Sequence, residues 1–127
     1  MTEVLPFLKK LVVAPGLTGH ETPIRKIIEE AWVPLCDEVS TSRLGSLHGL
    51  HRGTAPEPRP SILLAAHMDA IGLMVTRIVD GFLHITQVGG VDARVLPGQV
   101  VTVHGREDVP GIVVQPPARL LPENLQD

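Results

Sequence analysis

Residues 61–69 read Ser61-Ile-Leu-Leu-Ala-Ala-His-Met-Asp69 and are the most informative stretch for the fold. An unbroken apolar run from Ile62 to Ala66 is typical of a β-strand that is buried on both faces of an α/β sheet. The polar residues His67 and Asp69 follow directly at its C-terminal end. Ligand sites in open α/β sheets lie beyond the carboxyl ends of the strands, so the sequence predicts a functional site here.

His67 and Asp69 are two residues apart, and strand side chains with this spacing point to the same side. Histidine offers a neutral nitrogen ligand to a metal ion, and a nearby carboxylate can orient that histidine and raise its basicity. A strand that ends in a polar turn would explain the same tripeptide equally well. The tripeptide alone therefore leaves both interpretations open.

Two amphipathic helices are predicted before this strand. The first has apolar residues at three- and four-residue spacing and ends at Pro15-Gly16. The second should end near Pro34, and its apolar face consists of Ile24, Ile27, Ile28, Ala31, Trp32 and Leu35. Its start is marked by the capping-box spacing of Thr18 and Glu21, or alternatively by Thr22-Pro23 with proline at the first helical position.

The remaining segments have the two-residue period of strands. Strands are predicted at 39–42 and 46–52 around a turn at Gly45, and a proline-rich loop at 53–60. After Asp69, four short strands at 71–79, 82–88, 99–103 and 109–114 alternate with tight turns, which suggests a small antiparallel barrel or sandwich. The tail at 115–127 shows no convincing element. The predicted secondary structure thus changes from mixed α/β to strands alone at about residue 70.

Composition excludes several classes of function. A net charge of -3 and a pI near 6.0 do not support nucleic-acid binding, which usually leaves a basic stripe. The single cysteine, Cys36, rules out a disulfide framework and a four-thiolate zinc cluster, and it fits a reducing compartment. The N-terminus is not expected to act as a signal peptide, and no apolar run approaches the ~20 residues of a membrane span. We expect a cytoplasmic protein that contacts no membrane.

The run Leu63-Leu-Ala-Ala-His-Met-Asp-Ala-Ile-Gly-Leu-Met-Val75 resembles the "AHMDEIGFMV" stretch of the M42 metallo-aminopeptidases, the glutamyl and tetrahedral aminopeptidase group. Further segments follow in the family's order: Leu17–Glu21 is similar to its "S-G-x-E", Arg43–Ser46 to its "LGN" turn, and 81–83, 88–92 and 95–100 to its next segments. Two positions depart from the pattern. Ala70 stands where the family usually has glutamate, and Ser46 where it often has asparagine.

The resemblance implies a fold and an activity. Residues 1–70 would begin a zinc-peptidase-like three-layer α/β/α catalytic domain, and residues 71–127 would form part of a β-rich, small barrel-like insert that mediates dimerisation. The reaction would be removal of N-terminal residues from peptides by an oligomeric enzyme with two zinc or cobalt ions. His67 would bind one ion, and Asp69 would be the catalytic residue that supports it.

The resemblance also places the other metal ligands and the catalytic glutamate beyond Asp127. We therefore expect this chain to be inactive alone, with two metal ions in the complete site and none bound to the chain by itself. Whether this chain is an enzyme stays open at this point. The alternative is a non-catalytic truncated paralogue that acts as an oligomerisation or regulatory subunit. A third hypothesis, glycoside hydrolysis, is disfavoured because the sequence has only one tryptophan, two phenylalanines and no tyrosine.

The other polar candidates have simpler explanations. His48 and His51 are three apart in a predicted strand and therefore point to opposite faces. His20, His84 and His104 are expected to be exposed or capping residues. Asp92 and Arg94 are expected to form a surface ion pair.

Overall fold

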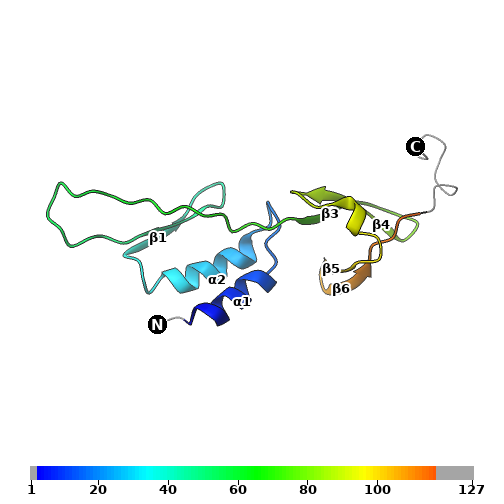
Figure 1. Ribbon diagram of the computed structural model, residues 1–127, viewed down its shortest axis with the longest axis horizontal. Coiled ribbons are helices and arrows are strands. Elements are labelled where there is room, and N and C mark those ends of the chain that lie inside the picture. The colour runs from blue at the N-terminus through cyan, green and yellow to red at the C-terminus, as the bar shows by residue number, and fades with distance from the viewer. Residues whose placement is uncertain (1–2, 117–127) are drawn as a thin grey trace. The chain divides into compact units, whose positions relative to one another are not determined.

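The computed structural model describes residues 3–116 and divides into two compact units, one ending at Gly89 and the other beginning at Gly90 (Figure 1). The first unit contains helices α1 (Val4–Val13) and α2 (Thr22–Trp32) and strands β1 (Glu38–Thr41), β2 (Leu47–Leu50), β3 (Gly72–Val79) and β4 (Phe82–Val88). The second contains the short 3-10 helix η1 (Ala93–Val95) and strands β5 (Val100–His104) and β6 (Asp108–Ile112). Most of the predicted tail lies outside the described residues.

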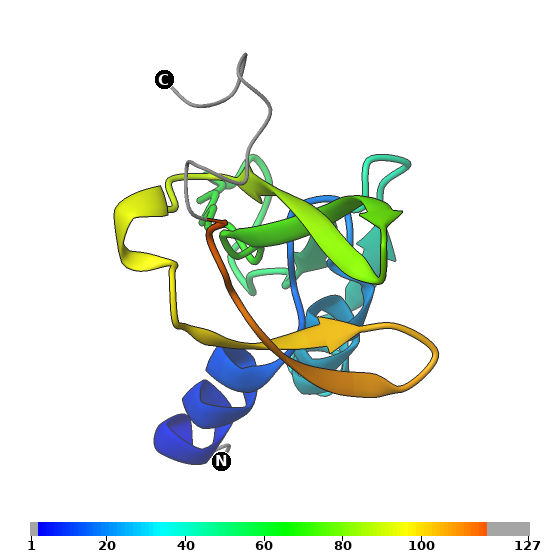
Figure 2. The ribbon, with the colours of Figure 1, turned by 90° about the vertical axis from the view of Figure 1, so that its right-hand side faces the viewer.

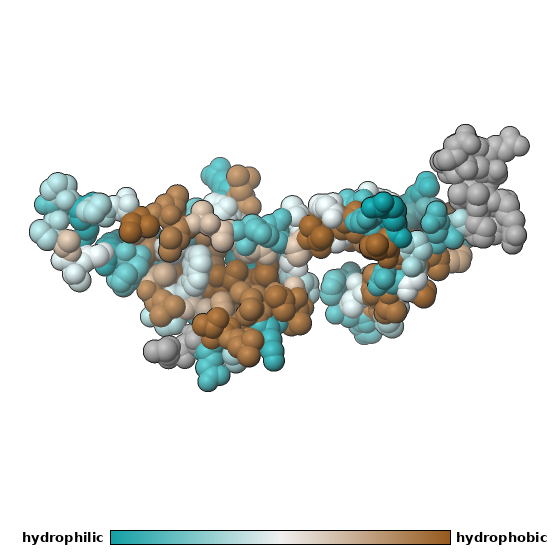
Figure 3. Space-filling view, in the orientation of Figure 1, coloured by the Kyte–Doolittle hydropathy of each residue, from teal (hydrophilic) through white to brown (hydrophobic). Residues whose placement is uncertain are grey.

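Both predicted helices are confirmed. Helix α1 ends at Val13, because Ala14 is already extended ahead of Pro15. Helix α2 begins at Thr22 with Pro23 in its first turn, as its second predicted start requires. Ile24 of α2, 7% exposed, is the one apolar side chain of the described residues that is buried. Apolar side chains also gather on the surface over the two helices (Figure 3).

The capping-box prediction for Thr18 and Glu21 is wrong. Glu21 precedes α2 directly, and its side chain makes no capping bond to the helix. Its carboxylate instead accepts the Gly19 N–H at 2.6 Å, and the Thr18 hydroxyl is used elsewhere. A helix does begin close to this segment, but the Thr18 hydroxyl binds a residue that is distant in sequence.

The two strands predicted around Gly45 are confirmed as β1 and β2, which form an antiparallel hairpin in which Glu38 faces Leu50 and Thr41 faces Leu47. Its turn contains Gly45, whose φ of 90° favours glycine. The end of α2 packs on this hairpin, because the Trp32 ring lies directly over the bare backbone of Gly49. The hairpin and the helix thus support each other at one point.

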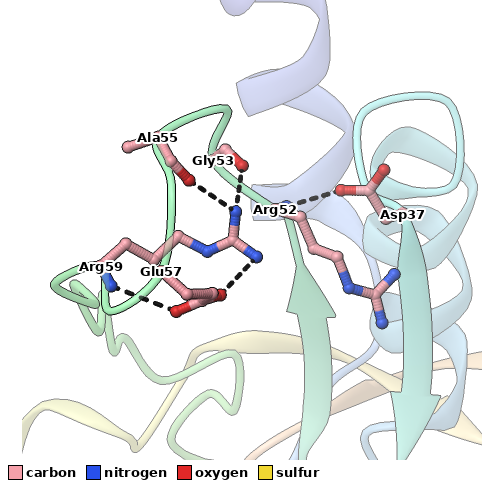
Figure 4. A network of polar contacts seen from close by, with 6 residues as sticks. All are labelled: Asp37, Arg52, Gly53, Ala55, Glu57 and Arg59. Carbon is pink, nitrogen blue, oxygen red and sulfur yellow. Dashed lines mark hydrogen bonds and ion pairs between the residues drawn. The ribbon is translucent and has the colours of Figure 1, made fainter.

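The proline-rich loop at 53–60 is confirmed, since it contains no helix or strand. It is organised by the guanidinium of Arg59, which donates to the carbonyl oxygens of Gly53 at 2.6 Å and Ala55 at 3.2 Å and pairs with Glu57 at 2.8 Å (Figure 4). At the base of the loop, Asp37 accepts the Arg52 N–H at 2.6 Å, which closes the β1–β2 hairpin.

The prediction of a doubly buried strand at 61–66 is wrong for the described residues. The segment is extended in Figure 1 but pairs with no other strand, and Ile62, Leu63 and Leu64 are 88–90% exposed. A strand exists only through hydrogen bonds to its neighbours, and residues 3–116 supply none for this segment. Its apolar composition suits a strand that is covered on both faces, and residues 3–116 do not supply that cover.

All four strands predicted after Asp69 are confirmed, as two antiparallel hairpins. Strands β3 and β4 are joined at Asp80-Gly81, where φ is positive at both residues, as a type I′ turn requires. Strands β5 and β6 form the second hairpin, which follows η1 (Figure 2). Within 3–116 the strands form separate two-stranded sheets, so closure into a barrel stays a prediction.

Candidate functional site

A backbone contact within the first unit brings the loop after α1 to the end of the 61–69 segment. Leu17 forms a short parallel bridge with Ala70, and the Ala70 N–H donates to the Gly16 carbonyl oxygen at 2.7 Å. Residues 16–18 therefore lie directly beside residues 69 and 70. This contact joins parts of the chain that are more than fifty residues apart in sequence.

His67 and Asp69 lie together, as their spacing predicts. The Nδ1 atom of His67 is 3.0 Å from the backbone oxygen of Asp69 and 3.2 Å from its Oδ1 atom. Both partners can only accept, so the ring hydrogen belongs on Nδ1. The neutral ring then carries its lone pair on Nε2, which is the form that binds a metal ion. The His67 side chain is 86% exposed, so this nitrogen is accessible.

The carboxylate of Asp69 is held from its other side by Thr18. The Thr18 hydroxyl donates to Oδ2 of Asp69 at 2.7 Å. This hydrogen bond, assisted by the contact with His67, lowers the pKa of Asp69, although partial desolvation opposes the effect. Asp69 is therefore ionised at neutral pH and can act as an acceptor for the imidazole.

Sequence reasoning missed Thr18 as a site residue. Its segment, Leu17–Glu21, does carry part of the family resemblance, but the local pattern indicated a helix start. No local signal connects Thr18 with Asp69, because the contact depends on how two distant loops meet.

A shallow hollow lies in front of this cluster. It has a volume of about 220 Å³ and is lined by Glu21, by the turn at 44–47 and by residues 66–69. A second hollow of about 230 Å³ is more apolar and is lined by Ile28, Trp32, Leu47 and residues 64–68. His67 borders both hollows.

The donor set of the described residues is incomplete for a metal ion. Across 3–116, no three or more His, Cys, Asp or Glu side chains converge on one point. A catalytic zinc site normally takes about three protein ligands and a water. His67 and Asp69 fit the role of one ligand and its orienting carboxylate, and the other ligands would have to come from elsewhere.

Four of the other candidate residues, His51, His104, Asp92 and Arg94, take part in separate surface pairs. His51 lies 3.5 Å from Asp37, and His104 lies 2.8 Å from Asp108 at the β5–β6 turn. The predicted Asp92–Arg94 pair is confirmed at 2.7 Å, and Asp92 also caps η1. None of these pairs lines either hollow. In the part of the chain that the structure describes, we find no helix with the length and apolar character to span a bilayer.

Comparison with known proteins identifies the family. Residues 45–126, which include His67 and Asp69, match the M42 glutamyl aminopeptidase family. The chain belongs to the M42 peptidase family. It corresponds to the N-terminal portion of an M42 aminopeptidase, and its mixed helix and sheet content is that of a partial α/β domain.

The relatives of this M42 chain are longer. The lysyl aminopeptidase of Pyrococcus furiosus is 36% identical over 96 residues, which cover 74% of this chain and 27% of the relative. The crystal structure of a TET aminopeptidase from a marine sediment Thaumarchaeota archaeon superposes with a TM-score of 0.80 at 34% identity, covering 96% of this chain and 34% of that one.

A third similar protein carries a different name. The crystal structure of a Thermotoga maritima protein described as an endoglucanase superposes with a TM-score of 0.68 at 40% identity, covering 73% of this chain and 30% of that one. The M42 chain thus spans about a third or less of each of these proteins.

Proposed function

We propose that this chain is part of a two-metal aminopeptidase that removes N-terminal residues from peptides. The observation that carries the proposal is the His67–Asp69 pair, with Nδ1 of the imidazole turned to acceptors and Nε2 left accessible. This pair lies inside the region that matches the M42 glutamyl aminopeptidases.

The geometry of the two side chains supports a role for each. His67 would present Nε2 to one divalent ion, and Asp69 would keep the ring hydrogen on Nδ1 and the ring plane in place. When bound, a pair of zinc or cobalt ions polarises the peptide carbonyl and makes an attacking water more acidic. The hollow bounded by Glu21 and residues 44–47 would receive the end of the peptide next to this imidazole.

The proposed architecture has two parts. Residues 1–70 would belong to a three-layer α/β/α catalytic domain, and residues 71–127 to a β-rich insert through which subunits pair. The apolar composition of the segment at 61–66 supports the first part, because further chain in a larger domain would cover the side chains that are exposed within residues 3–116. The hairpins after residue 71 support the second. We propose a homo-oligomer in the cytoplasm.

Isothermal titration calorimetry with zinc or cobalt chloride tests the metal role of His67. In the complete enzyme, which would supply the missing ligands, the wild-type protein and a His84→Ala control should bind with the same affinity, because His84 lies on β4 and lines neither hollow. His67→Ala should lose this binding. Equal binding by His67→Ala and the control would refute the proposed role of His67.

The incomplete donor set favours a second candidate function, a non-catalytic subunit that pairs through its β-rich half. Calorimetry on the complete protein separates the two proposals, because a non-catalytic subunit would bind neither ion while still sedimenting as an oligomer. Glycoside hydrolysis has the similarity to the Thermotoga maritima protein in its favour. Assays of the complete enzyme with an aminoacyl p-nitroanilide and with a β-glucan would distinguish peptidase from glucanase activity.

A further inference from the structure

The loop at 53–60 lies outside the candidate site and is not held by packing. None of its residues is buried, so apolar contacts do not order it. Its three prolines restrict the backbone only at their own positions. The hydrogen bonds and the ion pair within residues 53–60 all involve one residue, Arg59 (Figure 4). The conformation of the loop therefore depends on this side chain.

The guanidinium of Arg59 connects the end of the loop to its beginning and its middle. It donates to the carbonyl oxygens of Gly53 at 2.6 Å and Ala55 at 3.2 Å, and it pairs with Glu57 at 2.8 Å. The other carboxylate oxygen of Glu57 accepts the Arg59 N–H at 3.1 Å. A planar guanidinium can donate in several directions at once, whereas an ammonium group on a flexible stem is a point charge.

We propose that Arg59 is a strap that keeps this loop closed and so protects the Arg52–Gly53 peptide bond from proteolysis. Exposed loop tips are the preferred sites of proteolytic nicking, and cleavage takes place in the transiently opened form. The bond from Arg59 to the Gly53 carbonyl oxygen opposes this opening directly beside the peptide bond. Release of the strap should open the loop and leave the β1–β2 hairpin folded, because Asp37 still accepts the Arg52 N–H at 2.6 Å.

The strap matters for the rest of the chain because the loop is the connection between β2 and the segment that ends in His67 and Asp69. A cut after Arg52 would separate both helices and the β1–β2 hairpin from these two residues. The pieces would then be joined only by non-covalent contacts such as the Leu17–Ala70 bridge. This role of the strap requires neither metal binding nor peptidase activity.

Limited digestion of the chain with trypsin, followed by mass spectrometry of the fragments, tests the strap. Cleavage after Arg52 divides the chain at the start of the loop, whereas cleavage after Arg59 is slow because the next residue is proline. Arg59→Gln removes the guanidinium, and Arg59→Lys keeps only the positive charge. Arg94→Gln is the matched control, because it removes another guanidinium that pairs with a carboxylate, that of Asp92 at 2.7 Å.

Arg59→Gln should raise the rate of cleavage after Arg52 about 10-fold, the effect of losing one hydrogen bond to a charged group, because cleavage follows the population of the open loop. Arg59→Lys should give a rate between those of wild type and Arg59→Gln. Arg94→Gln should match wild type. Cleavage after Arg43, in the turn between β1 and β2, reports on unfolding of the first unit in the same digest. Its rate should be equal in every chain.

Two results would overturn the proposal. In the first, Arg59→Gln is cleaved after Arg52 at the wild-type rate, which would mean that the loop stays closed without the guanidinium. In the second, cleavage after Arg52 and after Arg43 rises in parallel, which would mean that Arg59 stabilises the whole first unit and has no separate effect on the loop. A rise at Arg52 with an unchanged rate at Arg43 supports the strap.

Discussion

Gly49→Ala should weaken the contact between α2 and the β1–β2 hairpin. A Cβ atom at position 49 would lie 2.8 Å from Sγ of Cys36 and 2.9 Å from Cε3 of Trp32. An ordinary van der Waals contact is about 3.5–4.0 Å, so the sulfur and the ring must each move by at least about 0.6 Å. Trp32 also lines the apolar hollow beside His67, so the same movement would disturb the site.

The expected loss of stability follows from two opposing effects. Overpacking of this kind costs about 1–3 kcal/mol in the free energy of unfolding. Replacing glycine by alanine also restricts the unfolded chain, which offsets about 0.4–1 kcal/mol of that loss. We expect a net destabilisation of about 1–2 kcal/mol. In a unit of this size, each kcal/mol lowers the unfolding midpoint by about 4–8 °C.

The unfolding midpoint can be measured by tryptophan fluorescence. The signal comes from the contact itself, because Trp32 is the one tryptophan of the sequence. Gly53→Ala is the matched control, since a Cβ atom there meets nothing within 4 Å. The control should melt at the wild-type temperature or slightly above it. Adding Cys36→Ala to Gly49→Ala should recover part of the loss. A Gly49→Ala chain that melts at or above the control would refute the packing argument.

Three further predictions concern the site, the pH dependence and the exposed segment. In the complete enzyme, Asp69→Ala should weaken zinc binding about 10- to 100-fold in calorimetry, because His67 loses its orienting group. Hydrogen bonding from the Arg52 N–H lowers the pKa of Asp37 in the folded chain. The ionised carboxylate therefore stabilises the fold above about pH 4, the usual pKa of an aspartate. This contribution is lost as the pH falls through the lowered pKa. Asp37→Asn should therefore be less stable than wild type to urea at pH 7 and equally stable near pH 2. Leu63→Lys should bring the sedimentation mass closer to the 13.7 kDa of the monomer, because a charge in an exposed apolar segment opposes strand association. An unchanged mass distribution would contradict this.

The elements that sequence analysis predicted correctly are those decided by nearby residues. Helix α2 follows from a regular apolar face and a proline in its first turn. The β3–β4 hairpin follows from alternating residues around Asp80-Gly81. The proximity of His67 and Asp69 was predicted in the same way, because a spacing of two determines on which side both side chains lie. In each case the relevant interactions span only a few residues.

The errors concern residues whose partners are distant in sequence. Thr18 has the spacing of a helix cap, yet its hydroxyl binds Asp69, 51 residues away. A hydroxyl cannot indicate which of two acceptors it will meet, because a local cap and a remote carboxylate satisfy it equally well. Only the way in which the two loops meet decides between them.

The segment at 61–66 shows which interactions hold the site together. Had the position of His67 depended on a paired strand, the exposed run from Ile62 to Leu64 would leave the imidazole without support. The structure instead holds this end of the segment by the Leu17–Ala70 bridge and the Thr18–Asp69 hydrogen bond, neither of which involves a neighbouring strand. The order of hydroxyl, carboxylate and imidazole is therefore a property of two loops. It should persist in the 127-residue chain whether or not the sheet around residues 61–66 is complete.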